Sequence, residues 1–102
     1  MTLAVITTKI QQKLAPPVTL RAKVLFDFGA DGVLYIDTTQ SPPVLTHNSD
    51  GVTPELTLQC TLATFAAILA GVKDPNIAYM TGQLKIKGPL SLAMRLNAFL
   101  ED

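Results

Sequence analysis

The sequence predicts an α+β domain in which helices cover one face of a mostly antiparallel, five-stranded sheet. Three observations lead to this prediction. Apolar and polar residues alternate along several stretches between residues 21 and 61, and turn-forming residues separate these stretches. Apolar residues recur at helical spacing before and after this region. A further alternating stretch, residues 83–87, lies between two helical patterns. The expected order is therefore helix, four strands, two helices, strand and helix.

An amphipathic helix is predicted at the N-terminus, because apolar residues recur there every three or four positions. These residues are Leu3, Ile6, Ile10 and Leu14. We expect Ala15-Pro16-Pro17 to end this helix, since proline lacks the backbone N–H that a continuing helix needs.

The alternating region predicts four strands. Val24, Phe26 and Phe28 share one face of the first strand, and the glycine-containing turn at residues 29–32 connects it to a return strand over Val33–Thr38. These two strands should form a β-hairpin. Two further strands are predicted at Val44–His47 and Glu55–Thr61.

The C-terminal part predicts the remaining elements. They are a helix from Thr61 to Gly71, a short helix from Asp74-Pro75 to Gly82, a strand over Gln83–Lys87, and a last helix that Gly88-Pro89 opens. Thr61 and Asp74 are suitable N-cap residues, because their side-chain oxygens can accept backbone N–H groups. Pro75 fits the first position of a helix. Leu84 and Ile86 should face inward from the strand.

The last helix has apolar residues around more of its circumference than one contact with a sheet would use. Ser91, Arg95 and Asp102 form one narrow polar stripe, and Asn97 and Glu101 form a second. Three explanations compete at this point: deep burial in the core, a subunit interface, or contact with a bound lipid.

Composition limits the classes of function. At 102 residues, the chain has the length of a single domain over residues 1–102. Eight basic and eight acidic residues cancel, so no net positive charge attracts nucleic acid or an anionic membrane. The single cysteine, Cys60, cannot form an internal disulfide. The N-terminal residues lack the pattern of a secretory signal, and we expect a cytoplasmic location.

Residue types that support catalysis are sparse, so we expect no enzyme, no cofactor and no metal site. His47 is the only histidine, and no second ligand stands near it at metal-binding spacing. Cys60 alternates with apolar residues and should be a buried small hydrophobe. Asp27 and Asp37 belong to outward faces of paired strands and should be solvated.

Three lysines have two possible roles. Lys85 and Lys87 share one strand face near Lys73, and they could contact a membrane or a lipid phosphate. Protection of an edge strand against aggregation is the simpler account and the one we favour.

Four motifs follow one another in the second half of the chain. They are Gly71-Val72-Lys73, Pro75-Asn76-Ile77-Ala78-Tyr79, Gly82-Gln83-Leu84-Lys85-Ile86-Lys87-Gly88 and Ala93-Met94-Arg95-Leu96. In this order they resemble the C-terminal half of the sterol carrier protein two family, also called non-specific lipid-transfer proteins. The N-terminal half is similar to the family in element order and in its hairpin.

The resemblance implies an apolar tunnel between the sheet and the helices, which binds a lipid without making or breaking a bond. The ligand would be a fatty acid, an acyl-CoA, a sterol or an isoprenoid, and the last helix would be the lid. The lining residues expected from it are Phe26, Phe28, Phe65, Ile68, Leu69, Tyr79, Met80, Leu84, Ile86, Met94 and Phe99, with Asn97 orienting a head group. For each apolar residue taken alone, packing in the core is an equal alternative.

Two other functions stay open at this point. The chain could be an accessory protein that presents a lipid intermediate, such as a quinone precursor, to partner enzymes. It could also be a structural module that dimerises through its last helix. A carrier is expected to be a monomer or weak dimer that contacts membranes transiently.

Overall fold

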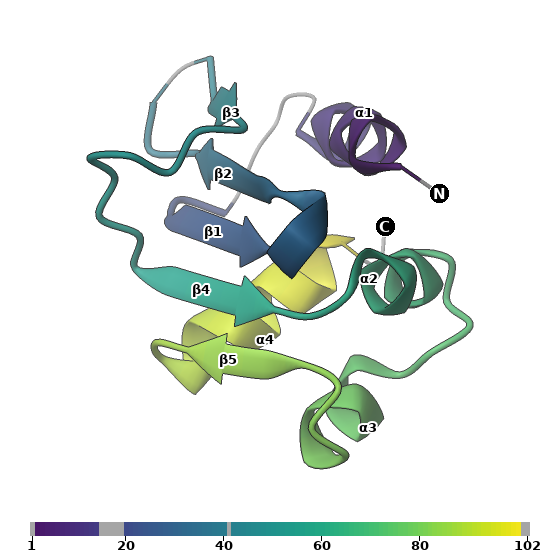
Figure 1. The fold of residues 1–102 in the computed structure, drawn as a ribbon. Helices are drawn as coiled ribbons and strands as arrows, with labels where there is room; N and C mark the ends of the chain where they lie inside the picture. The colour runs from purple at the N-terminus through teal and green to yellow at the C-terminus, as the bar shows by residue number, and fades with distance from the viewer. Residues whose placement is uncertain (1, 15–19, 41, 101–102) are drawn as a thin grey trace.

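The computed structural model describes residues 2–14, 20–40 and 42–100, and its elements follow the predicted order. Figure 1 shows a sheet with helices packed beside and behind it. The elements are α1 (Leu3–Lys13), β1 (Lys23–Asp27), the 3-10 turn η1 (Gly29–Asp31), β2 (Val33–Asp37), β3 (Val44–Thr46), β4 (Leu56–Gln59), α2 (Leu62–Leu69), α3 (Pro75–Met80), β5 (Lys85–Lys87) and α4 (Leu90–Leu100). Residues 15–17, which were expected to end the first helix, lie outside the described residues.

The strands form one five-stranded sheet in the order β3-β2-β1-β4-β5. β1 pairs with β2, β2 with β3, and β4 with β5, all antiparallel. β1 and β4 pair in parallel, with Val24 opposite Leu56 and Phe26 opposite Leu58. The prediction of a mostly antiparallel α+β fold is therefore confirmed, and one parallel pair joins the two halves of the sheet.

The core lies between the inward face of the sheet and the helices. Every second residue of β1 and β4 is buried, as the alternation predicted, whereas β2 buries its last four residues in a row. α1 contributes Ile6 and Ile10, both fully buried, and α4 contributes Leu92 and Leu96. α1 and α4 also contact each other, so the first and last helices lie side by side.

Capping side chains start the helices where the sequence predicted. The backbone N–H of Thr64 donates to Oγ1 of Thr61 at 3.1 Å, at the start of α2. The N–H of Asn76 donates to Oδ1 of Asp74 at 2.8 Å, at the start of α3. Each bond satisfies a backbone donor that has no partner within the helix.

Gly88, between β5 and α4, is held against the neighbouring strand. Its φ is +134°, a conformation that side chains rarely adopt. A Cβ at this position would lie 2.6 Å from the backbone oxygen of Glu55 and 3.1 Å from Cα of Leu56. Only glycine allows the chain to turn this closely into α4.

The expectation that both aspartates of the hairpin are solvated was wrong for Asp37, whereas Asp27 is half-buried. Register places Asp27 opposite Val33 and Asp37 opposite Lys23, at the two ends of the paired strands. Asp37 is buried, and it accepts hydrogen bonds from Thr39 and from Nε2 of Gln40. Burial raises the pKa of the Asp37 carboxyl, but these hydrogen bonds and the charge of Lys23 outweigh burial and hold the pKa below its ordinary value.

Several boundaries also differ from the predicted ones. Phe28 follows the end of β1 but stays buried, and β4 ends at Gln59, two residues before the predicted end. Cys60 is only partly buried. Within the described residues, the helices are too short or too polar to cross a membrane.

Candidate functional site

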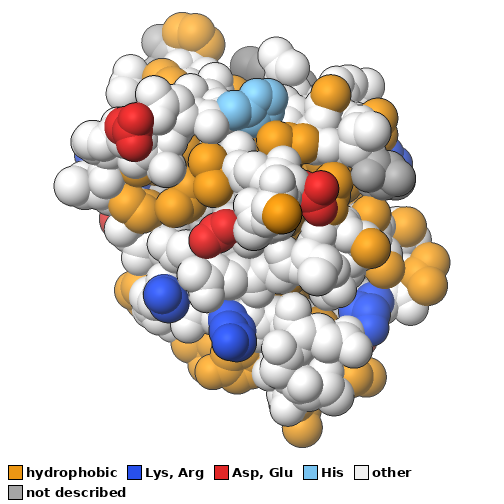
Figure 2. All heavy atoms as spheres, viewed as in Figure 1, with side chains coloured by type: hydrophobic (Ala, Val, Ile, Leu, Met, Phe, Trp, Pro, Cys, Tyr) orange, Lys and Arg blue, Asp and Glu red, His pale blue; other side chains and the backbone are white. Residues whose placement is uncertain are grey.

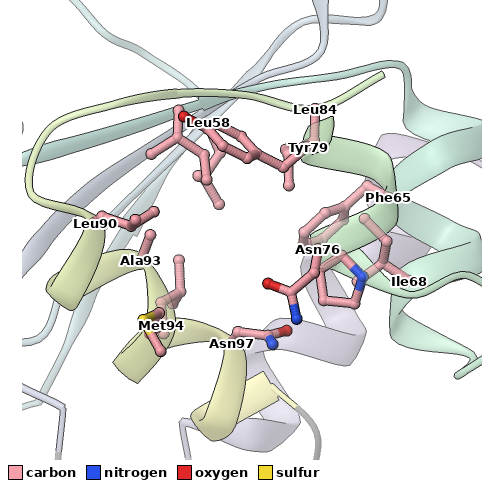
Figure 3. Close-up of a pocket in the computed structure, with 13 residues that line it drawn as sticks. Leu58, Phe65, Ile68, Asn76, Tyr79, Leu84, Leu90, Ala93, Met94 and Asn97 are labelled. Atoms are coloured by element: carbon pink, nitrogen blue, oxygen red, sulfur yellow. The ribbon is translucent and has the colours of Figure 1, made fainter. Parts of the chain in front are cut away.

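A pocket opens where the edge strand β5 meets α2, α3 and α4 (Figure 3). The cavity itself has a volume of about 70 Å³, and the wider hollow around it, which includes open solvent, has a volume of about 590 Å³. The lining residues are Leu58, Phe65, Ile68, Pro75, Asn76, Tyr79, Leu84, Ile86, Leu90, Ala93, Met94, Leu96 and Asn97.

The sheet and α2 supply the inner walls of the pocket. Leu58 of β4 lies opposite Ile86 of β5 in the sheet register, so the two side chains share one face of the sheet. Leu84 precedes β5, and its side chain is buried. Phe65 and Ile68 are three residues apart on α2, a spacing that puts both on one side of the helix.

α4 supplies a wall through a single face. Leu90, Ala93, Met94 and Asn97 follow the i, i+3, i+4, i+7 spacing of one helical stripe. In Figure 3 these four side chains lie along the side of α4 that faces the pocket. Together with the buried Leu92 and Leu96, this stripe accounts for the apolar circumference that the sequence left unexplained.

An aromatic cluster supports the wall that Phe65 forms. The ring centroids of Phe26 and Phe65 are 5.1 Å apart, and those of Phe28 and Phe65 are 5.4 Å apart. Both distances are within the range of favourable aromatic pairs. Phe26 and Phe28 are buried in the core behind Phe65 and do not line the pocket.

The pocket brings together part of the residue set expected from the sequence. The expected residues that line it are Phe65, Ile68, Tyr79, Leu84, Ile86, Met94 and Asn97. Leu69 is instead partly buried against the core, and Met80 is 82% exposed on α3. The side chain of Phe99 lies outside the described residues.

Sequence reasoning missed other lining residues, namely Leu58, Pro75, Asn76, Leu90, Ala93 and Leu96. The helical spacing of Leu90 and Ala93 with Met94 could have identified two of them. Nothing in the sequence marked Asn76, which reaches the pocket because its short helix begins beside it.

The polar groups of the pocket are uncharged. In Figure 3 the amide groups of Asn76, from α3, and Asn97, from α4, lie at the same edge of the pocket. Amide groups offer both hydrogen-bond donors and acceptors. Aspartate, glutamate, lysine, arginine and histidine are absent from the described lining. The site is therefore suited to hold an apolar molecule with a hydrogen-bonding end.

A second, wider hollow lies at the carboxyl ends of β1 and β4, beside Cys60. Burial, together with the charge of Asp27, raises the pKa of the Cys60 thiol to about 11. At neutral pH the sulfur is thus a thiol, a poor nucleophile.

The histidine, His47, lies on the surface, where its Nε2 is 2.8 Å from Oγ1 of Thr7. The described residues contain no group of three side chains arranged to hold a metal ion.

The fold agrees with that of known proteins. A family model described as the SCP-2 sterol transfer family matches residues 8–101. The chain belongs to this family. The resemblance drawn from the four sequence motifs is thereby confirmed.

Two relatives indicate how the domain is used elsewhere. The chain is 31% identical over 105 residues to non-specific lipid-transfer protein-like 1 of Caenorhabditis elegans, and the match covers 95% of this chain and 88% of that protein. It is 30% identical over 78 residues to stomatin-like protein 1 of Mus musculus, covering 76% of this chain. That match spans only 20% of the mouse protein, so the two share a domain.

Solved structures of sterol carrier proteins share the fold. Apo sterol carrier protein 2 from Yarrowia lipolytica superposes with a TM-score of 0.75 at 19% identity, covering 95% of this chain and 88% of that one. Palmitated SCP2L2 from Aedes aegypti superposes with a TM-score of 0.68 at 18% identity, covering 100% of this chain and 96% of that one.

Proposed function

We propose that this chain binds a lipid in the pocket between β5, α2, α3 and α4 and transfers it without chemical change. The observation that carries the proposal is the lining itself, in which apolar side chains from five elements surround uncharged amides. Membership of the SCP-2 sterol transfer family supports it. A fatty acyl or isoprenoid chain lies along the apolar part, and Asn76 and Asn97 bind its polar end.

The free energy for binding comes from burying the chain of the lipid. Each buried methylene contributes about 0.8 kcal/mol, so ten to twelve contribute about 8–10 kcal/mol. The cost of ordering the ligand and the side chains reduces this total. Before this cost, the total corresponds to an affinity in the micromolar range or tighter, and a carrier that must also release its lipid suits a moderate affinity.

Release requires a wall that moves, and α3 suits this role better than α4. Among its described side chains, α3 buries only Ala78, whereas α4 anchors Leu92, Ala93 and Leu96 in the core. Moving α3 therefore exposes little apolar surface. We assign the movable wall to α3, in place of the last helix expected from the sequence.

Titration with a fluorescent fatty acid tests the proposal. Met94, 64% exposed at the mouth, accepts a larger side chain without disturbing the core, so Met94→Trp should obstruct the pocket and raise the Kd about tenfold or more. Val5 is exposed on α1 and does not line the pocket, so Val5→Trp is the matched control. Equal effects of the two substitutions, or no saturable binding by the unchanged protein at micromolar concentrations, would refute the proposal.

Native mass spectrometry of protein purified from cells gives a second readout. A co-purifying lipid released at higher collision energy supports the carrier role. An empty dimer that persists on dilution contradicts it and favours a structural dimerisation module.

A further inference from the structure

β5 forms a free edge of the sheet. In the strand order β3-β2-β1-β4-β5, its only neighbour among the described strands is β4. The other side of β5, which faces away from the rest of the sheet in Figure 1, offers backbone N–H and C=O groups that no neighbouring strand pairs. Such an edge is a template on which another extended chain can pair.

The two faces of β5 differ in chemistry. Lys85 and Lys87 are exposed, whereas Ile86 between them is partly buried on the helix side, where it lines the pocket. Leu90 and Met94 line the same pocket and are 54% and 64% exposed. β5 therefore presents positive charge on one face and uncovered apolar surface beside the other.

The two lysines of β5 have no counter-charge within the described residues. Register places Lys87 opposite Thr57 and Lys85 opposite Gln59 on β4, and both of these neighbours are uncharged. Neither lysine forms an ion pair with a described residue. Figure 2 shows Lys or Arg side chains over the place where Figure 1 draws β5, and the acidic side chains in this view lie higher. The positive charge of this edge thus stays available to a partner.

We propose that β5 binds an extended acidic segment of a partner protein, which adds as a further strand to the five-stranded sheet. The segment alternates acidic and apolar residues. Its acidic side chains lie on the outer face beside Lys85 and Lys87, where opposite charges on neighbouring strands stabilise the pairing. The apolar side chain between them points to the helix side and covers Leu90 and Met94.

A second copy of the chain fits this edge less well than an acidic segment does. Two β5 strands paired antiparallel about Ile86 would place Lys85 of one copy opposite Lys87 of the other. Like charges directly opposite each other destabilise a sheet. The lysines therefore act in two ways, because they keep copies of the chain apart and also select a partner of opposite charge.

This inference goes beyond the proposed function and does not rest on it. Lys85 and Lys87 do not line the pocket, so pairing along the edge needs no bound lipid. Ile86 belongs both to β5 and to the pocket lining, so a partner paired with β5 lies beside the pocket. The edge is thus placed to bring a partner protein next to whatever the pocket holds.

Fluorescence anisotropy with labelled peptides tests the pairing. The probe is the peptide Thr-Glu-Val-Glu-Thr, and its charge-reversed counterpart is Thr-Lys-Val-Lys-Thr. The full chain should bind the acidic peptide saturably and the basic peptide about tenfold more weakly. The double variant Lys85→Glu with Lys87→Glu should exchange this preference. Lys9→Glu with Arg21→Glu changes the net charge equally at two exposed positions outside β5 and should leave the preference unchanged.

A third peptide separates strand pairing from charge attraction alone. The acidic peptide with N-methyl groups on both glutamates and on the valine keeps its charges but has no backbone N–H at these residues to donate to β5. Its affinity for the unchanged protein should be about tenfold lower, because strand addition depends on main-chain hydrogen bonds.

Several results would overturn the pairing on β5. Equal binding of the methylated and unmethylated acidic peptides reduces the interaction to charge alone. Equal effects of the two double variants place the peptide elsewhere. Absence of saturable binding at millimolar peptide removes the interaction. A dimer in analytical ultracentrifugation that the acidic peptide dissociates assigns the edge to a second copy.

Fatty acid binding by the same variants separates this inference from the proposed function. The Kd for a fluorescent fatty acid should stay unchanged in both double variants, because none of the substituted residues lines the pocket. Fatty acid binding without peptide binding refutes the pairing alone. Peptide binding without fatty acid binding refutes the proposed function and leaves the pairing in place.

Discussion

Gly88 is the position where a single methyl group should cost most. In Gly88→Ala, the new Cβ meets the carbonyl oxygen of Glu55 at 2.6 Å and Cα of Leu56 at 3.1 Å. Both are backbone atoms of the neighbouring strand and cannot rotate away. The positive φ costs about 1–2 kcal/mol, and the clash adds about 1–3 kcal/mol of the kind seen on overpacking. We expect the free energy of unfolding to fall by about 2–5 kcal/mol.

Gly82→Ala separates the two contributions. Gly82 also has a positive φ, +81°, but no atom lies within 4 Å of the Cβ position. It should therefore cost only the conformational part, about 1–2 kcal/mol. Urea unfolding of the two variants, followed by far-UV circular dichroism, measures the difference directly.

The clash should also change ligand binding. Relief of the contact with Glu55 and Leu56 requires the β5–α4 connection to move, and this connection carries Ile86 and Leu90 on either side. The Kd for a fluorescent fatty acid should therefore rise in Gly88→Ala more than in Gly82→Ala. If the two alanine variants have the same stability, the close approach of Gly88 to β4 does not limit the fold and this reasoning is wrong.

Three other predictions concern polar groups. Asp37→Asn should lower the free energy of unfolding at pH 7 by about 1.5–3 kcal/mol, because Thr39 and Gln40 then donate to a neutral acceptor. Because the native pKa of Asp37 is lowered, the unchanged protein should keep this stability above about pH 4 and lose it as the pH falls through the native pKa. Urea unfolding at pH 7 and at pH 3 should therefore show a smaller effect of pH on stability in the variant than in the unchanged protein. Cys60, with a pKa of about 11, should react with iodoacetamide at pH 8 much more slowly in the native state than in urea; equal rates would contradict its burial. Thr61→Ala removes the cap of α2 and should lower the thermal midpoint by an amount equivalent to about 1 kcal/mol. An unchanged midpoint would contradict this and would mean that water replaces the capping oxygen.

Local signals predicted much of the fold. Capping at Thr61 and Asp74 and alternation along the strands depend on residues close together in sequence, so they placed most elements correctly. The parallel pairing of β1 with β4 could not be predicted from such signals. Alternation indicates which face of a strand is apolar, but it does not identify the neighbouring strand.

The candidate site was predicted less completely, for a related reason. Periodicity distinguishes an inward from an outward side chain but not a core position from a pocket wall. Phe26 and Phe28 are inward and lie one layer behind the wall, whereas Phe65 forms the wall itself. Met80 was expected in the lining, but α3 is too short to bury a second turn, and its last residue points to solvent.

The parallel pairing of β1 with β4 has a consequence for the order in which the molecule folds. β1, β2 and β3 meet through connections of a few residues, whereas β4 must return past β2 and β3 to reach β1. Contacts between residues far apart in sequence form slowly, because the loop must close before they contribute. β5 joins the sheet only through β4. Residues of α3 line the pocket together with residues of β4 and β5. We therefore expect the pocket to be completed last during refolding, and its backbone amides to exchange with deuterium before those of the β1–β2 hairpin.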